Sequence, residues 1–235
     1  MSYHPDFSLL EAYAQGSIDA IHGVSVATHL EMCPHCRQQT RQLEEHCGDA
    51  LLKLETSSNL ETISSVVPAE PTADAHWQQM LEQIINSDAP ARPKLTRVKA
   101  PVVSVNGRQI TVPRALKRFV SSEAKWRSYG GKVFSLALHS DDNTHMNLMY
   151  ISAGVSIPQH THLGTESTLV LHGGFKDEDD HYDAGDFILR DGSVRHSPQT
   201  AQDQDCLCLT VLTEPMLFTR GVARLFNMFG KGLYP

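Results

Sequence analysis

The sequence predicts an α+β protein of two domains, a helical N-terminal part followed by a small C-terminal β-barrel or jelly roll. The hydrophobic pattern changes from a helical period to a strand period near residue 95. Residues 87–93, with two Pro and two Ala among seven residues, separate the two patterns with the composition of a linker. Residues 1–90 contain thirteen acidic and three basic residues, a net charge of −10, whereas residues 91–235 carry +3. We therefore place the helical domain at 1–90, the linker at 91–97 and the second domain at 98–235.

The composition is that of an ordinary globular chain, with 40% hydrophobic and 20% charged residues among 235. The first residues lack a basic stretch followed by an apolar one, and no apolar run is long enough to span a membrane. We expect a cytoplasmic protein without a membrane partner, in which five cysteines indicate metal or redox chemistry. The acidic N-terminal charge disfavours direct nucleic-acid binding and favours a basic protein partner, although a merely solvated surface explains it equally well.

Four helices are expected in the N-terminal domain. The first covers residues 8–14, and the second is capped by Ser17 and continues to Leu30. The third opens at Pro34 and reaches about residue 54, before a loop over residues 56–72. The fourth, residues 73–86, carries apolar side chains at helical spacing: Trp77, Met80, Leu81, Ile84 and Ile85. This stripe is either bundle core or a surface for a partner.

Six β-type runs with turn residues between them follow residue 98. They are residues 102–105, 133–139, 146–152, 167–171, 187–190 and 207–212. Many short strands separated by Gly and Asp turns are typical of a small barrel or jelly roll.

His29, Cys33 and Cys36 have the spacing of a metal site in the helical domain. His29 and Cys33 lie one helical turn apart, and Pro34 opens the helix that carries Cys36. The N-terminus of that helix favours the thiolate form. Two thiolates and an imidazole suit tetrahedral zinc, so the sequence predicts a helical bundle stapled by Zn²⁺.

The fourth zinc ligand is expected to be His4, brought in from the N-terminal segment. The alternatives are His22, His35, His46 and Cys47. Cys47 fails on geometry, because it lies about 16 Å beyond Cys36 along a continuous helix. It falls on the apolar face of Leu43 and Leu51 and is expected in the core. A redox Cys-x-x-Cys is the other interpretation, but that motif is expected after a strand in a βαβ unit, and none is visible.

A second group of metal-ligating residues lies in the β half. His160 and His162 alternate on a strand and so share a face, and Glu166 returns to that face after a turn at Gly164. His196 follows in a later segment. Three imidazoles and one carboxylate suit Zn, Fe, Mn or Ni. The prediction is Zn²⁺ or another divalent transition metal.

The spacing of these residues resembles the cupin superfamily. The first cupin motif is matched at every spacing by Gly154, His160, His162, Glu166 and Gly173. Gly185 and His196 match the second motif in length. The chain departs from it where cupins often carry Pro, Gly and Asn, since those places hold Asp191, Ser193 and Thr200. The resemblance implies a cupin domain whose metal is held by His160, His162, Glu166 and His196.

The two motifs in this order resemble the ChrR-type zinc-binding anti-sigma factors over nearly the whole chain. The N-terminal residues Leu9, Tyr13 and Gly16 and the stretch 27–30 fit that family too. The resemblance implies a regulator rather than an enzyme, with no catalytic residues and with zinc held by His4, His29, Cys33 and Cys36. Its helices would hold an extracytoplasmic-function-type sigma factor away from RNA polymerase. Its cupin domain would release the sigma factor on a signal, often reactive oxygen.

Two points stay open at this stage. The alternative function is a metal-dependent cupin enzyme, such as a dioxygenase or isomerase, with a fused zinc-binding module. Cys206 and Cys208 lie two apart on a strand and share a face, so they form either an oxidisable pair near the metal or two small buried hydrophobic residues.

Overall fold

The computed structural model describes residues 2–57, 71–87, 98–121, 125–141 and 144–220, together with 224 and 227. The chain divides into two compact units, Met1–Glu45 with Lys99–Pro235, and His46–Val98. The predicted linker at 91–97 and most of the predicted loop at 56–72 lie outside the described residues. The domain limits 1–90 and 98–235 therefore stay a prediction.

The first two helices are short and capped by aspartates. Helix α1 (Phe7–Ala14) begins after Asp6, whose carboxylate accepts from the Leu9 N–H at 2.7 Å. Helix α2 (Ala20–Met32) begins after Asp19, which accepts from two backbone N–H groups of the first turn at 3.0 and 3.1 Å. The predicted Ser17 cap is therefore wrong, because the Asp19 carboxylate satisfies two orphan donors where a hydroxyl satisfies one.

The two remaining helices are α3 (Pro34–Ser57) and α4 (Pro71–Asn86), which confirms the predicted opening at Pro34 and the predicted fourth helix. The expected burial of the outer α3 face is wrong. Leu51 is 60% exposed, and Cys47 is only half-buried. None of the described helices combines the length and apolar character that a membrane span requires.

The second half of the chain forms a cupin-like β-sandwich. Its strands are β1 (Val102–Val105), β2 (Arg108–Thr111), β3 (Arg127–Tyr129), β4 (Val133–Ser140), β5 (His145–Ile151), β6 (His160–His162), β7 (Glu166–Lys176), β8 (His181–Asp183), β9 (Phe187–Arg190), β10 (Cys206–Leu212) and β11 (Met216–Phe218). All six predicted runs are confirmed. The main sheet has the order β3-β4-β5-β10-β7-β8, with β9 also paired to β7, while β11 pairs with β6. The described strands form open sheets, so of the two predicted forms the barrel is wrong, whereas the jelly roll is not contradicted.

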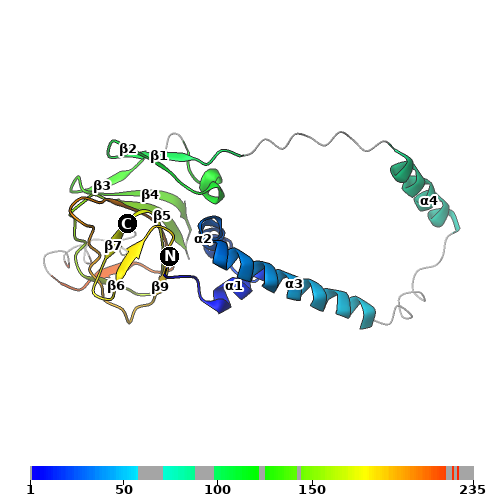
Figure 1. Ribbon diagram of the computed structural model, residues 1–235, viewed down its shortest axis with the longest axis horizontal. Coiled ribbons are helices and arrows are strands. Elements are labelled where there is room, and N and C mark those ends of the chain that lie inside the picture. Colours follow the sequence, from blue (N-terminus) through cyan, green and yellow to red (C-terminus); the bar gives the residue numbers. More distant parts are fainter. Residues whose placement is uncertain are drawn as a thin grey trace. The chain divides into compact units, whose positions relative to one another are not determined.

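Strand β10 is the centre of the main sheet, antiparallel to β5 and to β7, and all seven of its residues are buried. One face, with Leu207, Leu209 and Val211, belongs to a core that also includes Ile21 of α2. The other face, with Cys206 and Cys208, belongs to a second core. Helix α2 packs against β10, β7 and the short 3₁₀ helix η2 (Arg114–Arg118) (Figure 1). Helix α2 thus covers one face of the sheet, and residues of the other face line a cavity.

Candidate metal centres

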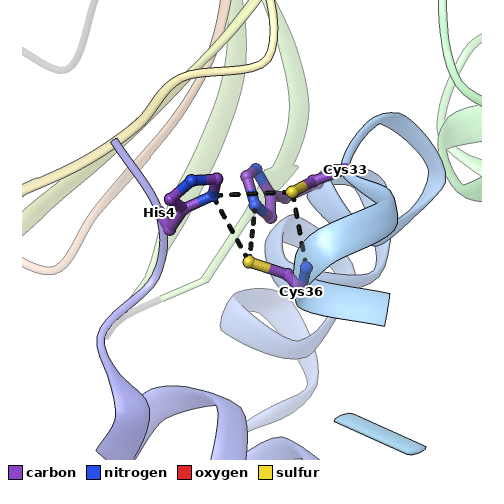
Figure 2. Close-up of side chains that lie close together, drawn as sticks. His4, Cys33 and Cys36 are labelled. Carbon is purple, nitrogen blue, oxygen red and sulfur yellow. Dashed lines mark hydrogen bonds between the residues drawn. The ribbon is translucent and has the colours of Figure 1, made fainter. Parts of the chain in front are cut away.

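The four predicted zinc ligands come together between the N-terminal segment, α2 and α3. The ligand atoms of His4, His29, Cys33 and Cys36 all lie within 4.8 Å of one another. Figure 2 shows the His4 ring facing both sulfurs, with Nδ1 at 3.5 Å from Cys33 Sγ and 3.4 Å from Cys36 Sγ. His29 Nε2 lies 3.3 Å from Cys36 Sγ. Four soft donors at one point have the chemistry of a tetrahedral zinc site.

The α2–α3 junction sets the positions of the two sulfurs. Cys33 ends α2 in an extended conformation, with φ −107° and ψ 105°, and Pro34 starts α3 directly after it. The Cys36 N–H in the first turn of α3 points at Cys33 Sγ, 3.4 Å away. Arg37 donates to the Leu30 carbonyl at the end of α2, at 2.6 Å. These contacts hold the end of α2 against the start of α3, with both sulfurs near His4 Nδ1.

Burial opposes the thiolate form of Cys36 that the helix N-terminus was expected to favour, whereas burial keeps His29 neutral, as a metal ligand must be. Burial and the adjacent Cys33 sulfur raise the pKa of Cys36 to about 12, and burial lowers the pKa of His29 to about 4. A bound metal reverses the first effect, because thiols release their protons to it. Of the alternative ligands, His35 lies beside His4 with ring centroids 5.4 Å apart, but it is not part of the converging group. His22 pairs with Asp19 instead.

The second predicted set also converges, inside the β-sandwich. His160, His162, Glu166 and His196 are all buried, and their ligand atoms lie within 4.8 Å of one another. His162 Nε2 is 2.9 Å from Glu166 Oε2 and 3.4 Å from His196 Nε2. Strand β6 carries the first two histidines, and a reciprocal backbone pair joins His160 to His196 at 3.1 Å in both directions.

Glu166 and His160 have the protonation states that a divalent metal requires. Burial opposes ionisation of Glu166, but the hydrogen bond and the charge of His162 lower its pKa to about 2. Burial and the neighbouring His196 lower the pKa of His160 to about 4. One carboxylate therefore stays ionised while His160 stays neutral at pH 7. His160 Nδ1 lies 3.0 Å from the Pro158 carbonyl, which leaves Nε2 for the metal.

The side chains that contact Nδ1 of His196 were not predicted from the sequence. Its Nδ1 lies 3.4 Å from Asp177 Oδ2 and also contacts the Arg190 guanidinium. Arg190 is 2.6 Å from the same carboxylate and donates to Tyr182 Oη at 2.9 Å. A carboxylate behind a ligating imidazole fixes its ring orientation. The one signal in the sequence is Arg190, a cation ending an apolar strand; nothing singles out Asp177 within its acidic loop.

The N-terminal segment, which carries His4, is attached to the β-sandwich. The Asp186 carboxylate accepts from the backbone N–H groups of Ser2 at 2.6 Å and Tyr3 at 3.2 Å. The Phe187 N–H donates to the Tyr3 carbonyl at 3.0 Å. The Tyr3 ring packs on Tyr182, with centroids 4.9 Å apart. Since Tyr182 also binds Arg190, a chain of contacts connects the two candidate metal centres.

Cys206 and Cys208 point to the same face, with their sulfurs 3.4 Å apart. Both are buried, and Cys208 lines the cavity that also borders Glu166. Interaction with Cys208 and burial both raise the pKa of Cys206, so its thiol stays protonated at neutral pH. The predicted common face is confirmed; an oxidisable role stays a prediction.

Known proteins resemble this chain over nearly its whole length. Residues 117–215 match the family described as the ChrR cupin-like domain. Over 227 residues the chain is 31% identical to the anti-sigma-E factor ChrR of Cereibacter sphaeroides, covering 97% of each chain. The chain belongs to the ChrR family. The matched length includes residues from both the helical and the β part of this chain, so the similarity is not restricted to the β part.

Solved structures are also similar to this chain. One is described as Rhodobacter sphaeroides SigE in complex with the anti-sigma ChrR. It matches 89% of this chain and 98% of the other with 26% identity and a TM-score of 0.60. An RmlC-like cupin protein from Ralstonia eutropha JMP134 matches 43% of this chain and 71% of the other, with 21% identity and a TM-score of 0.41.

Proposed function

We propose that this ChrR family member is an anti-sigma factor. It binds an extracytoplasmic-function-type sigma factor in the cytoplasm and releases it when its cupin domain senses a stress signal such as reactive oxygen. The observation that carries the proposal is the similarity over 97% of the chain to a protein named anti-sigma-E factor. The solved structure titled as a SigE–ChrR complex supports the same class of partner.

The unit His46–Val98 provides a surface for that partner. The apolar stripe of α4 is exposed to solvent: Trp77 by 65%, Leu81 by 56%, Ile84 by 66% and Ile85 by 69%. Leu51 and Leu52 of α3 are exposed by 60% and 63% in the same unit. Large apolar side chains gathered on an exposed helix face are typical of protein interfaces. Of the two interpretations of the stripe, a partner surface therefore has the stronger support.

Charge supports a basic protein as the partner. Residues 1–90 carry −10, which repels nucleic acid and attracts the basic surfaces with which a sigma factor binds polymerase and DNA. Covering such basic surfaces would keep the sigma factor from RNA polymerase. The proposal accordingly includes no direct nucleic-acid binding and no membrane partner.

Zinc is the proposed ion at His4, His29, Cys33 and Cys36. When bound, it supplies folding free energy by pinning α2, α3 and the N-terminal segment together. Cys33 and Cys36 hold the α2–α3 junction together, and His4 positions the N-terminal segment that pairs with the β-sandwich. The proposed cupin ion is Zn²⁺ or another divalent transition metal at His160, His162, Glu166 and His196.

The contacts between the two candidate metal centres offer a path by which a change in the cupin domain could lead to release of the sigma factor. A change at the cupin ligands that moves His196 displaces Arg190, which binds Tyr182. Tyr182 packs on Tyr3, and Tyr3 precedes the zinc ligand His4. A second contact runs from Glu31 of α2 to the backbone of η2, where it accepts from the Ala115 N–H at 2.7 Å. A signal in the cupin domain is proposed to reach the helices through these contacts.

Trp77→Ala tests the partner surface, with Gln78→Ala as the matched control on the same exposed helix. Aromatic interface anchors contribute about 2 kcal/mol or more, so Trp77→Ala should raise the dissociation constant for the sigma factor about thirtyfold. Gln78→Ala should leave it within about twofold. Both side chains are exposed, so neither change should lower the thermal midpoint. Equal affinities of both variants and wild type would exclude α4 as the sigma-binding surface.

His162→Ala tests the sensor, with exposed His181→Ala as control. The first variant should bind the sigma factor but fail to release it under oxidant, measured as output from a sigma-dependent reporter. Normal induction in His162→Ala would show that the cupin ligands are not needed for sensing. It would favour the enzyme alternative, for which turnover of a small molecule is the direct evidence. Constitutive output would show instead that the cupin metal stabilises the inhibitory complex.

A further inference from the structure

A cavity of about 420 Å³ lies inside the β-sandwich, next to the second candidate metal centre. Its buried end is formed by His160, Glu166 and His196, and exposed Gly130 and Lys132 lie at its solvent end. The walls between the two ends are mainly apolar, with Met149, Ile151, Ile157, Phe175, Met216 and Phe218. Both volume and lining are those of a small-molecule site.

The strand register sets the length of this cavity. At the buried end, Thr210 of β10 pairs with Thr168, one alternation along the strand from the Leu212–Glu166 pair. At the other end, a row of paired residues crosses the sheet: Cys206 of β10 pairs with Ile151 of β5, Ile151 with Val133 of β4, and Val133 with Tyr129 of β3. Four residues of β10 separate the two levels, about 13 Å at the rise of a strand. The site therefore suits an elongated molecule.

Two buried hydroxyls on the wall have no hydrogen-bond partner among the described residues. Thr210 Oγ1 makes no hydrogen bond although the residue is only 3% exposed, and Tyr129 Oη is also buried and unpartnered. Both residues line the cavity, Thr210 near the metal centre and Tyr129 toward the solvent end. An unpaired buried hydroxyl costs about 1–3 kcal/mol, so native proteins rarely retain one without a reason. A ligand with a polar head at the buried end would satisfy Thr210.

Charge balance selects the sign of that head group. A divalent ion with three neutral imidazoles and one carboxylate has a net charge of +1 in a buried, mainly apolar space. A monoanion neutralises this charge, whereas a dianion or a cation would leave an unpaired charge in a low dielectric. Lys132 at the solvent end adds a favourable potential for an entering anion.

We propose that the cavity binds an apolar monocarboxylate of the medium-chain fatty-acid class. Its carboxylate lies at the metal centre, where the Thr210 hydroxyl donates to it, and its hydrocarbon chain lies along the apolar walls. The inference rests on the proposed function only in requiring a divalent metal at the four cupin ligands. It names the ligand class through which the cupin domain would respond.

Calorimetric titration of the metal-loaded full chain with decanoate tests the proposal. Decanol keeps the chain but lacks the carboxylate, and propionate keeps the carboxylate but lacks the chain. We expect decanoate to bind at least about tenfold more tightly than either, since each lacks one of the two interactions. Equal binding of decanoate and decanol, or no binding of decanoate, would overturn the proposal.

Thr210→Val separates the ligand contact from a structural role. Valine has nearly the same shape and removes the unpartnered hydroxyl, so the unliganded variant should be at least as stable as wild type. Decanoate affinity should fall about fivefold, which is one lost hydrogen bond of about 1 kcal/mol. Unchanged decanoate affinity would place the carboxylate elsewhere and refute the assigned pose.

Metal analysis and sigma-factor binding of the same preparation separate this inference from the proposed function. A chain that holds its cupin metal and binds the sigma factor but not decanoate would refute the ligand class alone. A chain without cupin metal would refute both the cupin part of the proposed function and this inference.

Discussion

Asp186→Ala should loosen the zinc centre although Asp186 is not a zinc ligand. Its carboxylate accepts three backbone N–H groups, from Ser2 at 2.6 Å, Tyr3 at 3.2 Å and Asp183 at 2.8 Å. The residue is only 3% exposed. The first two bonds hold the segment that carries His4 against the β-sandwich. The substitution removes all three hydrogen bonds at once.

The expected magnitude follows from these three bonds. A hydrogen bond to a charged group contributes about 1.5–3 kcal/mol, but water replaces the acceptor wherever the freed N–H becomes exposed. We therefore expect a loss of about 2–4 kcal/mol in the free energy of unfolding. Outer groups that orient a metal ligand typically contribute 10–100-fold in metal affinity, so the dissociation constant for zinc should rise by about that factor.

Two measurements and one control check this prediction. Denaturant unfolding of the zinc-loaded protein gives the stability, and competition with a coloured chelator gives the zinc affinity. Asp183→Ala is the control, because its carboxylate is 63% exposed and pairs with the exposed His181. That variant should stay within about 0.5 kcal/mol of wild type. Wild-type zinc affinity in Asp186→Ala would refute the attachment of the His4 segment to the β-sandwich as a determinant of the site.

Three further predictions concern the same unit. Cys36→Ser should lose zinc and much helical circular dichroism, whereas Cys47→Ser should keep both; unchanged zinc content in the first would contradict the zinc centre. Gly173→Ala should destabilise by several kcal/mol, because its Cβ would lie 1.7 Å from the Asp205 carbonyl oxygen at φ +65°. Gly131→Ala, with φ +70° and open space, measures the backbone strain alone. Asp205→Asn should cost about 1–3 kcal/mol at pH 7, and this cost should begin to shrink as the pH falls below about 4 and vanish only in stronger acid, below the lowered folded-state pKa.

The sign of the last prediction follows from the ion pair of Asp205. Hydrogen bonds from Arg108 at 2.9 and 3.1 Å hold the pKa of this buried carboxyl well below its usual range, and Tyr150 donates to it at 2.7 Å. A lowered folded-state pKa contributes stability that is present above the unfolded pKa and is lost as the pH falls through the folded one. A difference between wild type and variant that persists undiminished in acid would contradict this assignment.

Local periodicity predicted which neighbouring ligands share a face, but not every member of the two candidate ligand groups. His29 and Cys33 are separated by one helical turn, and His160 and His162 by one strand alternation, so the sequence states which side chains share a face. The structure brings each set together for these reasons. His4 had to be selected as the fourth zinc ligand from several candidates. It lies in an extended terminal segment, where helical or strand periodicity does not indicate which residues it will meet.

Interactions between distant segments were not predictable. Tyr3 and Asp186 are 183 positions apart, and an aspartate in a Gly-Asp turn gives no sign that it will accept N–H groups from the chain terminus. The open form of the sheets was missed for a similar reason. The sequence indicates how many strands there are, but not whether the first and last strands of a sheet pair to close a barrel. Hairpin β1–β2 is different: Asn106-Gly107 between Val105 and Arg108 is a strong two-residue turn signal, which the sequence analysis overlooked.

The most direct test of anti-sigma activity is transcription in vitro by RNA polymerase with an extracytoplasmic-function-type sigma factor from the same organism. Titration of the zinc-loaded full chain should inhibit sigma-dependent transcription stoichiometrically, with the sigma factor recovered in a complex with this protein. The same titration against the housekeeping sigma factor should have no effect. Undiminished transcription at excess protein, with no complex recovered, would contradict the anti-sigma function.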